Sequence, residues 1–193
     1  MPQPAQKRDA RHTYADYLTW SDDERWELIH GVAYNMTPAP SRRHQAISME
    51  LARQFANHLV GKRCKVFNAP FDVRLPKPGE TDETTSTVVQ PDLVVVCDPA
   101  KLDDRGCKGA PDLVIEILSP ESLARDQREK LILYEQAGVP EYWIVHPADK
   151  TVSIYRQGSD SLYGKPALYT SEERPPVGVL PELEIDLGAV FTE

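Results

Sequence analysis

Two acidic residues lie in or beside short, continuous apolar runs, and this feature constrains the fold more than any other. Asp92 begins a run that continues through residues 93–96, and Glu116 lies in the middle of a run over residues 113–118. Runs of Val, Ile and Leu of this length are typical of strands covered on both faces. An ionised carboxylate is costly there unless it is paired, protonated or bound to a metal. The sequence therefore favours a divalent cation held between two neighbouring strands.

The composition indicates one soluble globular domain. The chain has 193 residues, of which 40% are hydrophobic and 27% are charged, which is enough for a core that folds alone. We expect residues 1–12 to form a disordered or loosely tied tail and residues 13–193 to form a single domain. The formal net charge of −8 disfavours a surface built throughout for nucleic acid, although a local basic groove remains compatible with it.

The cysteines and the hydropathy pattern bear on the compartment. No apolar stretch approaches the roughly 20 residues that span a bilayer, and the N-terminus has no hydrophobic segment that resembles a secretion signal. Cys64, Cys97 and Cys107 are odd in number and follow no metal-site spacing. We therefore expect three reduced thiols in a cytoplasmic protein with no membrane partner.

The order of elements predicts a mixed α/β or α+β domain around one sheet. The first half is expected to contain a short helix over 13–19, a hairpin of 25–29 and 32–36 around His30-Gly31, a long helix from Ser41 to Gly61, and a strand over 64–75. The second half is expected to contain a mobile loop over 76–86, the strands of Asp92 and Glu116, a helix from 119–122 to about 137, a hairpin of 141–146 and 151–156, and a final hairpin of 167–170 and 183–187.

Strand geometry refines the prediction for the acid pair. Side chains alternate faces along a strand, so Asp112, Glu116 and Leu118 share one face. If Asp92 points to the same side, both carboxylates converge on one ion, and the carbonyl of Ile117 supplies a further oxygen. Oxygen ligands with room for water and phosphate suit Mg²⁺ or Mn²⁺, and no His or Cys spacing suggests zinc.

Lys130 is the candidate cation of this site. It shares a helix stripe with Leu123, Tyr134 and Ala137 at intervals of three, four and seven, so its ammonium is expected to point towards the sheet. A cation there can stabilise a phosphate, an attacking hydroxide or the charge of a phosphoryl transition state. The alternative is a surface ion pair with Asp126, four residues earlier.

Structural interpretations also exist for the acids. Asp92 follows Pro91 and is equally well a turn residue, whereas Glu116 in mid-strand favours function. Asp112 is better explained as a turn residue or as an acid that supports the site indirectly. Glu27 alternates with Trp26 and Leu28 in the first hairpin, so it is either a further metal ligand or an exposed strand residue.

The start of the long helix carries three further candidates. His44 is more often a capping or solvated residue than a catalytic base. Together with Arg42 and Arg43, it would nevertheless place positive charge at a helix N-terminus, where phosphate binds readily.

Several motifs resemble the Uma2 family, a set of restriction-endonuclease-like proteins. They are ELIHG at 27–31, PDL at 91–93, APDLVIEILSP at 110–120 and GVPEYW at 138–143, with His44, Asp126, Lys130 and Tyr134. The resemblance spans about residues 14–156. It implies the PD-(D/E)XK nuclease fold, a mixed central sheet flanked by helices, here with extra N-terminal and C-terminal hairpins.

The resemblance also implies Mg²⁺-dependent cleavage of phosphodiesters. Asp92 matches the motif aspartate, Glu116 the second acid and Glu27 an upstream acid of the family. The chain departs from the superfamily signature at Leu118, where a lysine is expected, and Lys130 is the replacement that the family pattern suggests. His30 stands where the family more often has Asp, a change confined to the turn.

Two classes of function follow. One is a metal-dependent DNA endonuclease in which Asp92 and Glu116 bind the metal and Lys130 assists; the other is a nuclease-fold binding or regulatory module without cleavage activity. The retained acids and Lys130 favour the first, while the net charge and Leu118 favour the second. We also expect a two-fold homodimer, with the C-terminal tyrosines at 155, 163 and 169 exposed for the interface.

Overall fold

A computed structural model describes residues 11–20, 24–36, 40–119 and 126–192 of the chain. Residues 1–10 of the predicted N-terminal tail lie outside the described residues. From His12 onwards the chain is attached to the domain, because the backbone N–H of His12 donates to the carbonyl of Gly31 at 2.8 Å.

The sheet that carries the acid pair is mixed. Its order is β12-β11-β10-β9-β6-β3, with bounds Lys65–Asn68 for β3, Leu93–Val96 for β6, Leu113–Ile117 for β9, Glu141–His146 for β10, Thr151–Arg156 for β11 and Ala167–Thr170 for β12. Neighbouring strands are antiparallel except for β9 and β10, which are parallel. Helix α3 (Asp126–Ala137) lies between β9 and β10 in the sequence, as a parallel connection requires.

The domain contains a second sheet, where the sequence predicted only one, and the N-terminal hairpin belongs to it. Its order is β2-β1-β5-β4-β8-β7, with bounds Trp26–Ile29 for β1, Val32–Asn35 for β2, Val73–Arg74 for β4, Val88–Val89 for β5, Leu102–Asp103 for β7 and Gly106–Lys108 for β8. Helix α1 (Tyr14–Tyr17), capped by Thr13, lies beside it, and a 3₁₀ turn (Pro99–Lys101) precedes β7.

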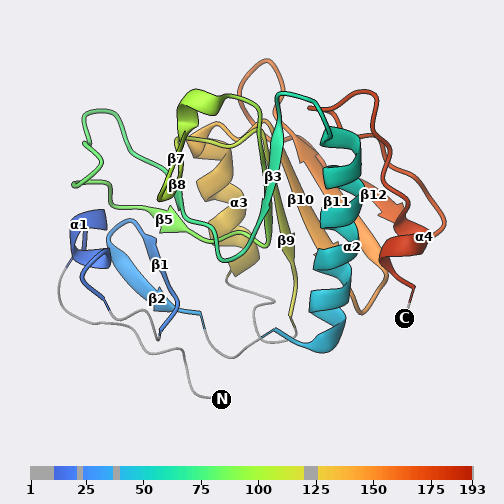
Figure 1. Cartoon of the computed structure of the whole chain (residues 1–193), viewed down its shortest axis with the longest axis horizontal. Helices are drawn as coiled ribbons and strands as arrows, with labels where there is room; N and C mark the ends of the chain where they lie inside the picture. The colour runs from blue at the N-terminus through green and yellow to red at the C-terminus, as the bar shows by residue number, and fades with distance from the viewer. Residues whose placement is uncertain (1–10, 21–23, 37–39, 120–125, 193) are drawn as a thin grey trace.

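Helices cover both faces of the first sheet (Figure 1). Helix α2 (Arg42–Leu59), capped by Ser41, and helix α4 (Leu187–Val190) pack on the face that includes Leu93 and Ile115. Helix α3 and residues of the second sheet pack on the opposite face, which includes Val94 and Val114. Strand alternation explains this division, because adjacent residues of β6 and β9 face opposite layers.

Most predicted elements are confirmed. They include α1, the β1–β2 hairpin, α2, the strands after Asp92 and around Glu116, and the β10–β11 hairpin. Helix α3 ends before Gly138, whose φ of +81° is a conformation that favours glycine. Most of the predicted cap of this helix at 119–122 lies outside the residues that the structure describes, and so does Leu123.

Two strand predictions were wrong. The single strand expected over 64–75 divides into β3 and β4, which belong to different sheets, because Pro70 lies between them and cannot donate to a ladder. The final hairpin does not form either: β12 pairs with β11, Glu184 makes only an isolated bridge with Pro176, and Leu187 begins α4.

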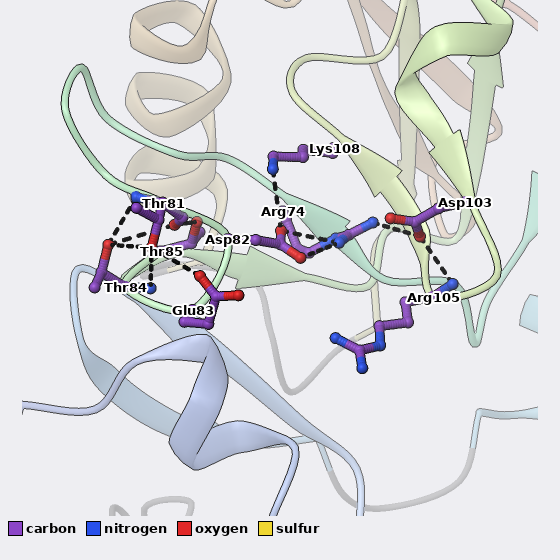
Figure 2. Close-up of polar contacts among 9 residues, drawn as sticks. All are labelled: Arg74, Thr81, Asp82, Glu83, Thr84, Thr85, Asp103, Arg105 and Lys108. Carbon is purple, nitrogen blue, oxygen red and sulfur yellow. Dashed lines mark hydrogen bonds and ion pairs between the residues drawn. The ribbon is translucent and has the colours of Figure 1, made fainter.

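The loop over 76–86, expected to be mobile, is attached to the second sheet by side chains. Figure 2 shows Asp82 accepting two hydrogen bonds from Arg74 Nη1, each 2.9 Å long. Thr85 is fully buried, and its hydroxyl donates to the carbonyl of Thr81 at 2.8 Å. The polar composition of this loop therefore supports specific contacts with the domain.

The prediction of three reduced thiols was also wrong. Cys64 and Cys97 form a disulfide, while Cys107 is free and buried. The two bonded cysteines flank the partners Lys65 and Val96 of the antiparallel pair β3–β6. Their separation of 33 residues in the sequence concealed this adjacency. Within the described ranges, no helix is long and apolar enough to cross a membrane.

Candidate active site

The strand register brings Asp92 and Glu116 to the same end of the β6–β9 pair. Leu93 and Ile115 are direct antiparallel partners, so Asp92, one residue before Leu93, lies opposite Glu116, one residue after Ile115. Residues directly opposite each other in an antiparallel pair are close neighbours. The predicted proximity of the two acids therefore follows from the backbone pairing.

Glu116 points from β9 towards α3, where two donors meet one of its oxygens. Its Oε1 accepts hydrogen bonds from Lys130 Nζ at 2.9 Å and from the hydroxyl of Tyr134 at 2.8 Å. The Glu116 side chain is only 12% exposed, so this carboxylate is held in a fixed orientation inside the domain.

Lys130 joins Glu116 to a second acid, Glu27 of β1. Lys130 Nζ lies 2.9 Å from Glu27 Oε1, which also accepts the backbone N–H of Gln90 at 3.0 Å. Lys130 and Glu27 are 8% and 6% exposed. Lys130 is therefore buried beside the acids, as its helix stripe predicted, and Glu27 is a partner of the ammonium and not an exposed strand residue.

The pKa values of Glu116 and Lys130 reflect their burial and the charges around them. Burial and the charges of Asp92 and Glu27 raise the pKa of Glu116 to about 7, although Lys130 opposes the shift. Burial lowers the pKa of Lys130, but the two glutamates outweigh it and hold that pKa well above its usual range. The ammonium is thus charged at neutral pH, and it does not offset the cost of burying Glu116 in its charged form.

Asp92 is oriented by the backbone of β9 and by the first turn of α2. Its Oδ2 accepts the N–H of Ile117 at 2.7 Å and lies 3.2 Å from His44 Nε2. Burial lowers the pKa of His44, but the hydrogen bond and charge of Asp92 raise it overall. His44 Nδ1 is buried with no hydrogen-bond partner in the described part of the chain. His44 therefore contacts Asp92 directly and is not merely a capping residue.

The two carboxylates fit a hard divalent cation better than any other metal. The carboxylates of Asp92 and Glu116 contact other described side chains and N–H groups through Oδ2 and Oε1, while Oδ1 and Oε2 accept no hydrogen bond from the described residues. Among the described residues, no three or more His, Cys, Asp or Glu side chains form a metal-binding group. Mg²⁺ commonly needs only one or two carboxylates and fills its other positions with water and phosphate.

The remaining candidates divide between the two ends of the sheet. Asp112 lies at the far end of β9, where its carboxylate accepts the backbone N–H of Cys97 at 2.7 Å, so it caps the strand pair and does not join the site. Arg42 and Arg43 begin α2 beside His44, and the contact of His44 with Asp92 brings that helix end to the site.

Sequence reasoning missed the roles of Tyr134 and Gln90. Tyr134 was placed on the stripe of Lys130, and its spacing of four was the signal that it reaches the same carboxylate. The N–H of Gln90 is bonded to Glu27 through a contact between distant segments, for which the sequence gives no local signal.

Comparisons with known proteins agree with this architecture. The family model Uma2, described as "Putative restriction endonuclease", matches residues 14–188. An uncharacterized protein of Synechocystis sp. is 29% identical over 148 residues, which cover 75% of this chain and 74% of that protein. A crystal structure described as a "putative nuclease belonging to DUF820" from Anabaena variabilis aligns with a TM-score of 0.73 and 21% identity, over 93% of this chain and 97% of that one. The fold is thus restriction-endonuclease-like, and the chain belongs to the Uma2 family.

Proposed function

We propose that this protein is a metal-dependent endonuclease that hydrolyses phosphodiester bonds of DNA. The observation that carries the proposal is the position of Lys130, whose ammonium lies 2.9 Å from Glu116. It supplies from α3 the cation that the nuclease signature expects at position 118, where this chain has Leu. Family membership supports a nuclease-like activity, and the donor set supports Mg²⁺ or Mn²⁺ as cofactor.

Each residue has a specific role in this proposal. Asp92 and Glu116 would hold the metal, which when bound lowers the pKa of its water and neutralises charge on the phosphoryl group. Lys130 stabilises negative charge that develops at the scissile phosphate. Glu27 and Tyr134 fix Lys130 and Glu116 in position, and His44 orients the carboxylate of Asp92.

Arg42 and Arg43 are proposed to bind a phosphate next to the scissile one. The first turn of α2 contains no acidic residue to complement the helix dipole. Positive side chains at a helix N-terminus oppose that dipole, whereas a bound phosphate is stabilised by both. This local charge offsets the negative charge of the whole chain.

The test is nicking of supercoiled plasmid with Mg²⁺, Mn²⁺ or EDTA. We expect relaxed plasmid with either metal, none with EDTA, and none with Asp92→Asn. Asp112→Asn is the matched control, because Asp112 lies at the opposite end of the same strands, and it should nick as the parent does. Plasmid that stays supercoiled under all metal conditions would contradict the proposal.

A nuclease-fold binding module without cleavage remains the second candidate. The net charge of −8 and Leu118 favour it. This candidate expects metal-independent binding of DNA with no nicking, so the same plasmid samples analysed by gel shift separate the two functions.

We further propose that the protein forms a homodimer, since duplex cleavage needs two active sites or two successive events. Tyr155 and Tyr163, expected at the interface, are partly buried around Tyr142 and are poor interface candidates. Leu168 of β12 is 63% exposed, and β12 is the edge of its sheet, which supports pairing there. Light scattering at micromolar concentration should give twice the monomer mass, and a monomeric mass would refute it.

A further inference from the structure

A cavity of about 270 Å³ lies next to Asp92 but is separate from the Lys130 group. Its lining residues include Phe71, Asp72, Gln90, Asp103, Arg105 and Gly106. Two of its walls border Asp92: Gln90 precedes it by two residues, and the segment 70–72 follows Ala69, whose N–H donates to the carbonyl of Asp92 at 3.1 Å. The cavity therefore borders the backbone of Asp92, although the Asp92 side chain does not line it.

One wall of the cavity is aromatic. Phe71 lines it and stacks on Phe67, with ring centroids 4.3 Å apart and planes 5° from parallel. Phe67 therefore already covers one face of the Phe71 ring. An aromatic residue at this position can contact a planar ring.

The polar wall offers one carboxylate oxygen in a fixed position. Asp72 Oδ1 accepts hydrogen bonds from the Tyr17 hydroxyl at 3.0 Å and from Gln90 Nε2 at 2.9 Å. The amide of Gln90 is itself oriented by Arg25, which donates to its Oε1 at 3.1 and 3.0 Å. Asp72 Oδ2 accepts no hydrogen bond from any described residue and is thus available to a donor on a ligand.

The rim of the cavity carries an uncommitted guanidinium. The backbone N–H of Arg105 donates to Asp103 at 2.8 Å, whereas its guanidinium makes no hydrogen bond or ion pair with the described residues and extends away from Asp103 (Figure 2). Asp103 is already paired with Arg74 at 2.6 Å. Arg105 can therefore contact a phosphate at the mouth of the cavity.

The shape of the cavity is fixed by a close backbone approach. Gly106 has a φ of +123°, and a Cβ built on it would lie 2.2 Å from the carbonyl oxygen of Asp72. The N–H of Cys107 donates to the same carbonyl at 2.8 Å. The β7–β8 turn can hold Asp72 in this position only with glycine at 106.

We propose that this cavity binds one unstacked nucleobase of the nucleic-acid substrate, and that Asp72 Oδ2 accepts a hydrogen bond from its exocyclic amino group. The inference rests on the proposed function for the identity of the substrate. Phe71 stacks on the base, Asp72 distinguishes amino-bearing bases, and Arg105 contacts the adjoining phosphate. The cavity is smaller than the range typical of drug-sized ligands and suits a single ring system.

The test uses metal-free protein in EDTA, so that no cleavage is needed. Calorimetric titration compares dAMP with the matched purine deoxyribonucleotide that lacks the 6-amino group. We expect dAMP to bind the parent protein about 5–10-fold more tightly, the usual effect of one hydrogen bond. In Asp72→Asn the amide retains the acceptor for Tyr17 and Gln90 but replaces Oδ2 with a donor, so this ratio should fall to about 1.

Further variants separate the base site from folding and from catalysis. Phe71→Leu should weaken both nucleotides alike, while Asp149→Asn on the exposed β10–β11 turn should change neither. Lys130→Ala should keep the preference for dAMP, because Lys130 lies outside the cavity. An equal affinity of the parent protein for both nucleotides, or a preference that survives Asp72→Asn, would overturn the inference even if the plasmid is nicked.

A second titration separates a substrate base from a free nucleotide. A short thymine strand with one central adenine should bind more tightly than dAMP, since its phosphates also reach Arg105. The same strand with an abasic position in place of adenine keeps these phosphates but loses the base, so it should bind more weakly than the adenine strand. A strand that binds no more tightly than dAMP would overturn the assignment to a substrate base.

Discussion

Two buried cations in this domain, Lys130 and Arg74, are each held by two carboxylates, yet they differ in how their charge is balanced. The Lys130 side chain is 10% exposed, and its partners Glu27 and Glu116 are 7% and 12% exposed. Arg74 is completely buried, but its partners Asp82 and Asp103 are 23% and 47% exposed (Figure 2). Solvent can therefore reach the acids around Arg74 and hardly reaches those around Lys130.

The titration of the acids reports the same difference. The hydrogen bond from Arg74 lowers the pKa of Asp103, which is the behaviour of a satisfied ion pair. Burial raises the pKa of Glu116, and the charges of Asp92 and Glu27 raise it further, so the single ammonium of Lys130 does not offset them. A buried ion pair alone thus indicates structure, whereas a buried pair with unneutralised charge is what a catalytic metal site needs.

The largest effect is expected from removing Arg74. Arg74→Leu removes three charge-assisted hydrogen bonds to Asp82 and Asp103 and should lower the free energy of unfolding by about 3 kcal/mol, measured by urea denaturation. Arg63→Leu is the matched control, because Arg63 is 71% exposed and its pair with Asp98 is long, at 3.4 Å; it should cost less than about 1 kcal/mol. An equal loss of unfolding free energy in the two variants would mean that the buried ion pairs of Arg74 stabilise the protein no more than an exposed pair does.

Removing Lys130 should affect catalysis more than stability. Lys130→Ala is expected to lower the rate of plasmid nicking about 100-fold, because loss of one preorganised electrostatic contact typically has this effect. Metal and DNA affinity should change much less, since the contact acts mainly in the transition state. Lys62→Ala, which removes an exposed partner of Glu182, should nick at the parent rate. A Lys130→Ala variant as fast as the parent would give Lys130 a structural role like that of Arg74.

A divalent metal should stabilise the protein by binding at Asp92 and Glu116, without involving the ion pairs of Arg74. At about 100 times the dissociation constant, Mg²⁺ or Mn²⁺ is expected to add about 2.7 kcal/mol to the parent protein, measured as a rise in melting temperature. Asp92→Asn and Glu116→Gln should lose most of this rise, and Asp112→Asn should keep it. A rise that persists in both site variants would place the metal elsewhere.

The smallest effect per step of a titration is expected from pH in metal-free protein, because the change is spread over several pH units. The pKa of Glu116 is raised from 4.5 to about 7, so the folded state binds the proton more tightly than the unfolded state. The stabilisation is present below about pH 4.5 and is lost as the pH rises through 7, with a slope of at most about 1.4 kcal/mol per pH unit. Comparison of unfolding curves for the parent and Glu116→Gln isolates this slope. A slope shared by the variant would belong to another group.

The success of the sequence prediction depended on whether the signal was local. Strand alternation placed Glu116, and helix periodicity placed Lys130, because both patterns lie within one element. The disulfide of Cys64 and Cys97, the pairing of Glu27 with Lys130 and the contact of His44 with Asp92 join segments far apart in the sequence. The ion pairs of Arg74 were also missed. The sequence predicted one strand through Pro70, whereas the chain passes from the first sheet to the second there.

The position of Gly106 has a consequence for mutational scanning of this protein. Every substitution there must displace the backbone of Asp72, so a saturation library screened for activity will reject all alternatives at 106. Such intolerance is the usual signature of a catalytic residue, although Gly106 has no side chain and takes part in no chemistry. A screen that scored protein abundance alongside activity would identify position 106 as a geometric requirement and keep it out of the list of active-site residues.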